Sequence, residues 1–290
     1  MPPSPSGRLV LVATPIGNLE DLPPRAARVI AEADVVCCED TRHSGQLFSR
    51  LGLRPHRLVS LHGHNEAARA PEVMGWLAEG LTVALVSDAG LPGVSDPGGR
   101  VVAAAHEAGA RVTAVPGPSA APTAVALAGL GDGRWRFEGF LPRKGPERRQ
   151  RVALAARSDV VTVFYESPRR VDTLLEELAA AAGDARLVAV GRELTKLHEE
   201  LWRGPIGRAR GRWPSEKARG EFVLVLDAAP PETPEPPPPG ELAGAVEELV
   251  AGGLSRRDAV TDVAGRLGIN RRAVYDALAR GSPRGRPDAL

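Results

Sequence analysis

Three loops rich in glycine and proline carry the residues best suited to hold a ligand. They comprise residues 14–18, 87–99 and 116–120. Glycine lacks a Cβ atom, so main-chain N–H groups in such loops can approach a ligand closely, and proline stiffens the backbone around them. In the second loop the carboxylate of Asp88 can accept hydrogen bonds from hydroxyl or ammonium groups. One loop of this kind is typical of a turn, but three of them favour a ligand cradle.

The two common nucleotide-binding fingerprints are missing from the sequence. No G-x-G-x-x-G pattern follows the first predicted strand, and no G-x-x-x-x-G-K-[ST] pattern occurs anywhere. A loop that grips phosphate groups is therefore not expected. The residues alone predict a nucleoside-like ligand that is held by main-chain contacts and one carboxylate.

Carboxylates and histidines in loops that follow strands are the candidates for a general base. Glu39 and Asp40 follow the second predicted strand, and His64 follows the third. We take these three residues as the candidate catalytic set. Their spacing singles out none of them, and Glu166 and Glu193 are further candidates from the second half of the chain.

Two of these segments allow other interpretations. Residues 39–42 suit a helix N-cap with an arginine ion pair equally well. His62 and His64, with Glu66 nearby, could suggest a metal site. No cysteine or further histidine completes a set of ligands, so we expect no metal, and hydrogen bonding within the loop or contact with RNA are the alternatives.

The strongest local basic patch lies between residues 143 and 151. It holds five basic residues against one acidic residue, and the basic ones are Arg143, Lys144, Arg148, Arg149 and Arg151. A Gly-Pro pair within the patch is expected to present these charges on a loop, where they would bind RNA phosphates. A solvated helix start is the alternative interpretation.

Two further groups could contact RNA. Lys196 either neutralises a phosphate or pairs with Glu193. Three arginines at 208, 210 and 212 lie close in sequence to Trp202 and Trp213, which could add stacking contacts unless Trp202 belongs to the core.

The elements that position these residues begin with short β-branched runs that alternate with amphipathic segments. Strands are expected at residues 9–13, 34–38, 58–61, 82–86 and 111–115, and helices at 24–33, 66–79 and 99–108. This alternation is typical of an α/β layer with a largely parallel sheet. In such a sheet ligands bind beyond the carboxyl ends of the strands, where the three loops are expected.

A second α/β unit follows a glycine-rich turn at residues 130–133. Its strands are expected at 137–140, 160–165, 187–190 and 222–226. Seven prolines within residues 229–240 then indicate an extended spacer. We therefore expect an N-terminal α/β domain (1–116), a second α/β domain (117–228), a proline-rich linker (229–240) and a C-terminal helical domain (241–290).

Three short helices are expected in the C-terminal domain. The first covers residues 241–251, the second begins at Ser255 with Asp258 as its capping partner, and the third follows a glycine turn. The arrangement resembles a helix-turn-helix whose third helix opens with Arg271 and Arg272. These arginines favour contact with nucleic acid over a protein-docking or purely structural bundle.

Composition restricts the class of protein. The chain has 290 residues, 43% hydrophobic and 25% charged, and a net charge of +1, so any contact with nucleic acid must come from local patches. Cys37 and Cys38 adjoin within an apolar run, where strand geometry sends them to opposite faces as reduced packing residues. No basic segment precedes the first apolar run, and no run approaches the roughly eighteen apolar residues of a membrane span. We expect a cytoplasmic protein without membrane contact.

Eight segments in chain order resemble the motifs of one family. They are residues 13–19, 39–43, 87–92 with 95–98, 116–120, 140–144, 164–168, 192–196 and 220–222. The chain resembles the ribosomal RNA small subunit methyltransferase I family, a branch of the tetrapyrrole methylase superfamily. Its C-terminal bundle is also similar to the small terminal domain of that family.

The resemblance implies a homodimer of two-domain protomers that holds S-adenosylmethionine in the cleft between the domains. It implies transfer of a methyl group to the ribose 2′-oxygen of a cytidine in the decoding region of 16S rRNA, either naked or within the small ribosomal subunit. The implied cofactor-binding residues are Pro15, Ser87, Asp88, Ala89, Gly90, Pro92, Ser119, Ala120, Tyr165, Glu193, Leu194 and Thr195. The chain departs from the family pattern at Leu91, which removes a side-chain hydroxyl, and at Arg169.

Two other functions are compatible with parts of the sequence. One is methylation of a tetrapyrrole or another small metabolite by an enzyme of the same superfamily. The other is a nucleic-acid-binding regulator that uses the α/β portion as a ligand sensor. The basic patch and the C-terminal bundle argue against the first, and the full set of second-domain motifs argues against the second.

Overall fold

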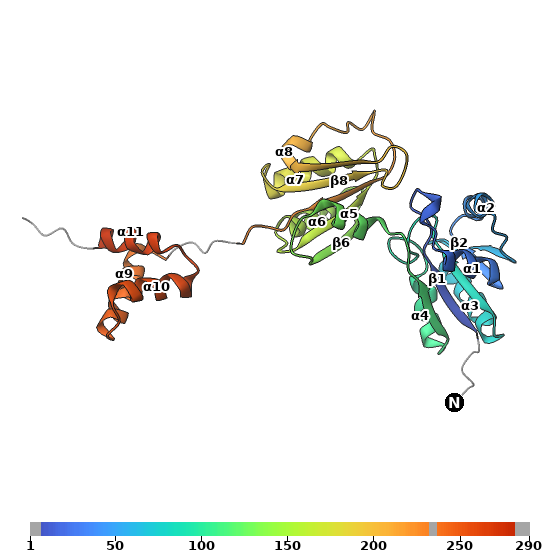
Figure 1. Ribbon diagram of the computed structural model, residues 1–290, viewed down its shortest axis with the longest axis horizontal. Coiled ribbons are helices and arrows are strands. Elements are labelled where there is room, and N and C mark those ends of the chain that lie inside the picture. Colours follow the sequence, from blue (N-terminus) through green and yellow to red (C-terminus); the bar gives the residue numbers. More distant parts are fainter. Residues whose placement is uncertain (1–6, 232–236, 282–290) are drawn as a thin grey trace, which may run out of the picture. The chain divides into compact units, whose positions relative to one another are not determined.

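The structure is a computed structural model that describes residues 7–231 and 237–281. The chain forms two compact units, Met1–Ala229 and Pro230–Leu290. The first unit holds two sheets, drawn from blue to orange in Figure 1, and the second holds the red helices.

The first sheet contains the five predicted strands, all parallel. They are β1 (Arg8–Val12), β2 (Val35–Cys38), β3 (Leu58–Ser60), β4 (Thr82–Val86) and β5 (Arg111–Val115), in the spatial order β3-β2-β4-β1-β5. Their positions confirm the predicted strands to within one or two residues. Because all five run in the same direction, the loops that follow β1, β4 and β5 emerge at one edge of the sheet.

Helices cover both faces of the first sheet, which is why its central strands are apolar on both sides. Helices α3 (Glu66–Ala78) and α4 (Gly99–Glu107) pack on the face that carries Cys37. Helices α1 (Pro24–Glu32) and α2 (Thr41–Arg50) pack on the face that carries Cys38. Both cysteines are buried and free, as predicted. Helix α2 is absent from the predicted helices because its sequence is poor in strong helix formers.

The second sheet is mixed rather than parallel. Its strands are β6 (Trp135–Phe140), β7 (Val161–Glu166), β8 (Leu187–Arg192), β9 (Glu200–Pro205) and β10 (Phe222–Leu226), in the order β6-β7-β10-β8-β9. Only the β6–β7 pair is parallel. The edge strand β9 was not predicted, because its residues lack a β-branched apolar run and end in Gly-Pro.

Helices also cover both faces of this second sheet. Helices α6 (Pro146–Ala156), α7 (Val171–Ala182) and α8 (Ile206–Ala209) share one core with it. Helix α5 (Ala120–Ala128) packs on the opposite face through its alanines. Helix α5 directly follows the loop after β5. The chain therefore passes from the edge of the first sheet, where the glycine- and proline-rich loops emerge, onto the second sheet. A boundary at residue 116 remains a prediction, because the first unit is not subdivided.

The second unit is a bundle of three helices, α9 (Pro239–Ala251), α10 (Arg256–Leu267) and α11 (Arg271–Gly281). Helix α9 starts at Pro239, two residues before its predicted start at residue 241, with this proline at its first position. The predicted cap of α10 is present, since the Ser255 hydroxyl accepts from the Asp258 N–H at 3.2 Å. Residues 232–236 of the predicted linker and 282–290 of the predicted domain lie outside the described residues. No helix among those described is long and apolar enough to cross a membrane.

Candidate functional site

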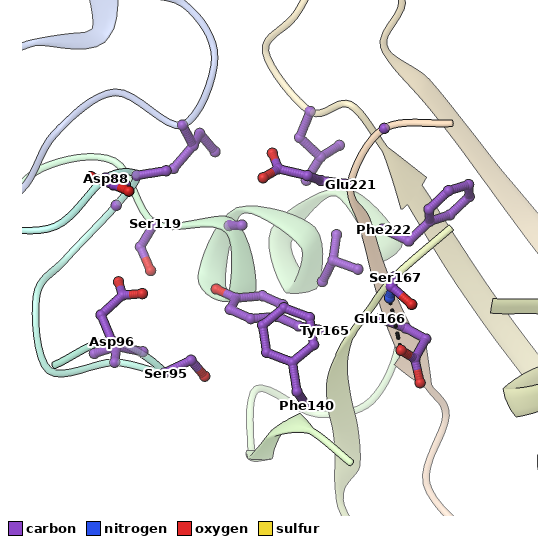
Figure 2. A pocket seen from close by; sticks show the side chains of 18 of the residues that line it. Asp88, Ser95, Asp96, Ser119, Phe140, Tyr165, Glu166, Ser167, Glu221 and Phe222 are labelled. Carbon is purple, nitrogen blue, oxygen red and sulfur yellow. Dashed lines mark hydrogen bonds between the residues drawn. The ribbon is translucent and has the colours of Figure 1, made fainter. Parts of the chain in front are cut away.

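A cavity of about 390 Å³ lies between the loop edge of the first sheet and the second sheet. The loop after β4 contributes Asp88, Ala89, Gly90, Leu91, Val94, Ser95 and Asp96, and the loop after β5 contributes Ser119 and Ala120. Figure 2 shows Asp88, Asp96 and Ser119 on one side of this space, with Tyr165, Glu221 and Phe222 on the second-sheet side. The cavity therefore gathers two of the three predicted cradle loops, with Ile16 from the third.

Backbone contacts between neighbouring strands hold the wall made by the β4 loop. Thr14 and Gly90 form an isolated antiparallel bridge, with N–H···O distances of 2.9 and 3.1 Å. The Thr14 hydroxyl donates to the Ser87 carbonyl at 3.0 Å, and the Ser87 hydroxyl donates to the Gly90 carbonyl at 2.9 Å. Gly90 has a φ of +86°, which favours glycine. None of these contacts uses the side chain of Leu91, so the departure from the family pattern leaves the cradle intact.

Asp88 supplies an unsatisfied acceptor at the cavity wall. Its Oδ1 atom is buried and has no hydrogen-bond partner among the described residues. A buried carboxylate oxygen without a donor costs free energy, which a ligand hydroxyl or ammonium group would recover. The cavity therefore fits a ligand that presents such a donor at this point.

Asp96 is a half-buried carboxyl that sequence reasoning did not single out. Burial, followed by the negative charges of Glu39 and Asp88, raises the pKa of Asp96 to about 7. Burial and the charge of Asp88 also raise the pKa of Glu39. Residues 95–98 were recognised as a motif, but only the folded loop shows that Asp96 faces the cavity beside Asp88.

The second-sheet wall is built around Tyr165. Its ring packs edge-on against Phe137 and Phe140, at centroid distances of 4.9 and 5.6 Å. Its hydroxyl accepts a hydrogen bond from the Ala121 N–H at 3.1 Å, which ties the wall to the first turn of α5. Burial raises the pKa of Tyr165, so this side chain is neutral near pH 7.

Seven of the predicted cofactor residues line this cavity, and the other five do not. Those that line it are Asp88, Ala89, Gly90, Ser119, Ala120, Tyr165 and Leu194. Ser87 and Pro92 are buried beside it, and Pro15 lines a second, adjoining cavity. Glu193 accepts from Lys196 Nζ at 2.8 Å, and the Thr195 hydroxyl accepts from the Asn18 N–H at 3.2 Å. Glu193 and Thr195 therefore make hydrogen bonds within the protein. The ion pair between Lys196 and Glu193 confirms the pairing interpretation of Lys196.

The candidate catalytic residues Glu39, Asp40 and His64 line neither cavity. Asp40 caps α2 by accepting from the N–H groups of Arg42 and His43 at 2.8 and 3.3 Å, which lowers the pKa of Asp40. The capping interpretation of residues 39–42 is thus the one that the structure supports. His64 is exposed, with its ring 6.0 Å from that of His62. No group of three or more potential metal ligands occurs in the described part of the chain.

The basic patch is divided between the core and the surface, which corrects the prediction that it forms a loop. Residues from Pro146 onward belong to α6, so only Arg143 and Lys144 lie on the loop. Arg148 is only 3% exposed, and its Nε donates to the Glu177 carboxylate at 2.8 Å. It is therefore unavailable to RNA. Arg151 donates to Glu138, while Arg143, Lys144 and Arg149 are exposed.

The two other groups predicted to contact nucleic acid are the arginines of α11 and the pair Trp202 and Trp213. Arg271 and Arg272 are exposed at the first turn of α11. Trp213 is buried and packs edge-on against Trp202 at 6.2 Å, and the Arg212 guanidinium lies over both rings. The core interpretation of Trp202 is supported, because this ring is partly buried against the second-sheet core.

The chain is similar to known methyltransferases. A family model for the Tetrapyrrole (Corrin/Porphyrin) Methylases matches residues 8–210. The "Ribosomal RNA small subunit methyltransferase I" of Mycobacterium tuberculosis is 43% identical over 275 residues, 94% of this chain and 95% of the relative. The protein of the same name from Synechocystis sp. is 39% identical over 269 residues, 93% of this chain and 96% of the relative.

Solved structures share the arrangement of the first unit. The uroporphyrin-III-C-methyltransferase of Thermus thermophilus aligns with a TM-score of 0.54 at 22% identity, covering 76% of this chain and 94% of that one. The methyltransferase CobJ aligns with a TM-score of 0.59 at 23% identity, covering 77% and 95%. At this level of identity the likeness shows the fold alone.

Proposed function

The chain belongs to the ribosomal RNA small subunit methyltransferase I family within the tetrapyrrole methylases, and we propose that it methylates 16S rRNA with S-adenosylmethionine as the donor. The proposed acceptor is the ribose 2′-oxygen of a cytidine in the decoding region. The observation that carries the proposal is the unpaired Asp88 oxygen at the wall of a cavity of about 390 Å³. It rests equally on the extent of the similarity to the named relatives.

The cavity suits S-adenosylmethionine in shape and charge. Its lining includes the aromatic side chains Phe140, Tyr165 and Phe222, which suit a purine ring, and no lysine or arginine. Asp88 is placed to accept from a hydroxyl or ammonium group of the cofactor, and the nearby main chain of Ala89 and Gly90 forms a close-fitting wall. The bound cofactor would supply a methyl group that its sulfonium centre already activates.

The protein must then orient the acceptor and receive its proton. A ribose hydroxyl is a weak nucleophile, so holding it in line with the methyl group supplies much of the rate enhancement. Asp96 is the side chain that we assign to the proton, because it lines the cavity and has a pKa of about 7. Glu39 acts through Asp96, since its negative charge helps to raise that pKa.

Exposed cations near the second-sheet wall are proposed to hold the RNA backbone. Phe140 lines the cavity and is the last residue of β6, and the loop that follows it carries Arg143 and Lys144. Arg149 is exposed on α6. Arg271 and Arg272 are proposed to add phosphate contacts from the second unit. Such contacts weaken as salt increases, because counterions compete for the phosphates.

We also propose that the protein works in the cytoplasm as a homodimer, as the family resemblance implies. The function is tested by offering the purified protein labelled S-adenosylmethionine with either unmodified small ribosomal subunits or a porphyrin precursor. Label in the 16S rRNA supports the proposal. Label in the porphyrin precursor alone would replace it with small-metabolite methylation.

A further inference from the structure

A second cavity of about 240 Å³ adjoins the first and has a different chemical character. The two cavities share Ile16, Asp88, Ala89 and Glu221 as lining residues. Asp88 and Ala89 therefore lie where the larger and the smaller space adjoin. A group held in the smaller cavity would approach the proposed cofactor at these residues.

The two cavities differ in the charges that line them: the larger has acidic groups alone, and the smaller has groups of both signs. The acidic side chains that line the larger cavity are those of Asp88, Asp96 and Glu221, and no basic side chain lines it. This suits a cofactor that carries sulfonium and ammonium charges. The smaller cavity also contains the basic side chains of Arg50 and Lys196, the imidazole of His43 and the amide of Gln46. Asp88 and Glu221 line the part shared with the larger cavity, whereas the groups on α2 can bind an anion such as a phosphodiester.

One face of α2 supplies most of the polar lining. His43, Gln46 and Arg50 follow the three- and four-residue spacing that places side chains on the same side of a helix. The opposite side is anchored, since Ser44 and Phe48 are each 1% exposed in the core. The Asp40 cap described above holds the first turn. Helix α2 is thus a fixed support that presents polar groups to the cavity.

These polar groups are free to bind a ligand. The side chains of His43, Gln46 and Arg50 are exposed, and none makes a hydrogen bond or an ion pair within the described parts of the chain. Lys196, by contrast, is held by Glu193 and Glu221 at 2.8 and 2.6 Å. Arg50 is consequently the lining side chain best able to neutralise an incoming negative charge.

The opposite wall depends on a close approach that only glycine allows. A Cβ atom at Gly17 would lie 3.0 Å from the Thr195 hydroxyl and 3.1 Å from the Leu194 carbonyl, and it would collide with the Lys196 side chain. The loop after β1 can therefore pack directly on residues 194–196. Gly17 and Lys196 both line the smaller cavity, so this contact forms part of its wall.

We propose that the smaller cavity is the acceptor subsite, in which Arg50 and His43 hold a backbone phosphate of the RNA next to the target ribose. The inference rests on the proposed function and names the part of the site that selects the acceptor. Phosphate held on α2 would position the neighbouring ribose beside Asp88 and Ala89, where the smaller cavity adjoins the cofactor cavity. Gln46 would contact the sugar or base with its amide.

The test measures acceptor and cofactor binding separately in the full-length protein. R50Q removes the cation, R50K keeps a point charge, and R28A removes an exposed arginine from α1 as the matched control. R50Q should raise the KM for unmodified small subunits about tenfold. The KM of R50K should stay close to that of the wild type, and the KM of R28A should be unchanged. The Kd of S-adenosylmethionine, measured by calorimetry, should be the same in all four proteins.

Failure of this inference can be told apart from failure of the proposed function. If the wild-type protein labels no 16S rRNA, the proposed function is wrong. If the wild type labels it and R50Q has the KM of R28A, the subsite is wrong while the function stands. A loss of cofactor affinity in R50Q, with KM for subunits unchanged, would place Arg50 in the cofactor site and also overturn the inference.

Discussion

Asp88 and Asp96 approach one cavity from the same loop, and the charge of Asp88 helps to raise the pKa of Asp96 to about 7. The two carboxyls have different environments. Asp88 has an oxygen without a partner among the described residues, whereas Asp96 is half-buried beside the further charge of Glu39. One loop can thus supply both a ligand contact and a proton acceptor, because the surroundings of its two carboxyls separate their roles.

Asp96 should set the pH dependence of methyl transfer. Its raised pKa means that the carboxylate, which is the form that accepts a proton, becomes dominant only as the pH rises through about 7. The single-turnover rate should therefore increase between about pH 6 and 8 and level off above that range. D96N should lower the rate about 100-fold and abolish this rise. A D96N protein with the wild-type rate and profile would remove Asp96 from catalysis.

Asp88 should contribute to cofactor affinity. Replacing it by alanine removes the unpaired acceptor, and the loss of a hydrogen bond to a charged group should weaken the affinity for S-adenosylmethionine by about 10- to 100-fold. D21A removes an exposed carboxylate from a different segment, earlier in the chain, and serves as the control. The measurement is isothermal titration calorimetry. Equal affinity in D88A and wild type would show that Asp88 does not contact the cofactor.

Arg148 and its neighbour Arg149 should have separate effects. R148A leaves the buried Glu166 and the Glu177 carboxylate short of a partner, so it should lower the free energy of unfolding by about 3 kcal/mol, although Arg170 still pairs with Glu166. R149A removes an exposed charge and should cost under about 0.5 kcal/mol while weakening RNA binding. Urea unfolding and filter binding measure the two effects. A stable R148A protein with weakened RNA binding, or an unstable R149A protein, would contradict the assignment of Arg148 to the core and Arg149 to the surface.

The C-terminal unit should serve RNA binding rather than cofactor binding. Residues 230–290 form a unit with its own apolar core, so their removal should leave the first unit folded. The truncated protein should bind small subunits more weakly, with the Kd of S-adenosylmethionine nearly unchanged. The R271A/R272A protein should reproduce part of the loss in the full-length chain. A comparable loss of cofactor affinity on truncation would show that the unit supports the active cavity instead.

Local sequence patterns predicted most of the framework. The β-branched runs before the glycine- and proline-rich loops fixed the positions of β1 to β5, because an apolar strand covered on both faces leaves a clear signal. The edge strand β9 lacks that signal and was missed. Helix α2 was also missed, although the cap at Asp40 was recognised as one interpretation of residues 39–42.

The site was less predictable because its roles depend on tertiary contacts. Arg148 and Arg149 look alike in the sequence, yet the packing of α6 buries one and exposes the other. Glu193 and Thr195 belong to a recognised motif, but they brace loops instead of lining the cavity. The properties of Asp96 come from burial and from Glu39, which is distant in sequence. No local pattern carries that information.

Mapping the methyl group on 16S rRNA tests the central claim most directly. Unmodified small subunits are incubated with the wild-type protein and labelled S-adenosylmethionine, and the rRNA is then hydrolysed with alkali. A 2′-O-methyl group blocks cleavage at its own nucleotide, so we predict label in one alkali-resistant dinucleotide whose 5′ nucleoside is cytidine. Label on a base, or in a porphyrin precursor without any in rRNA, would contradict it.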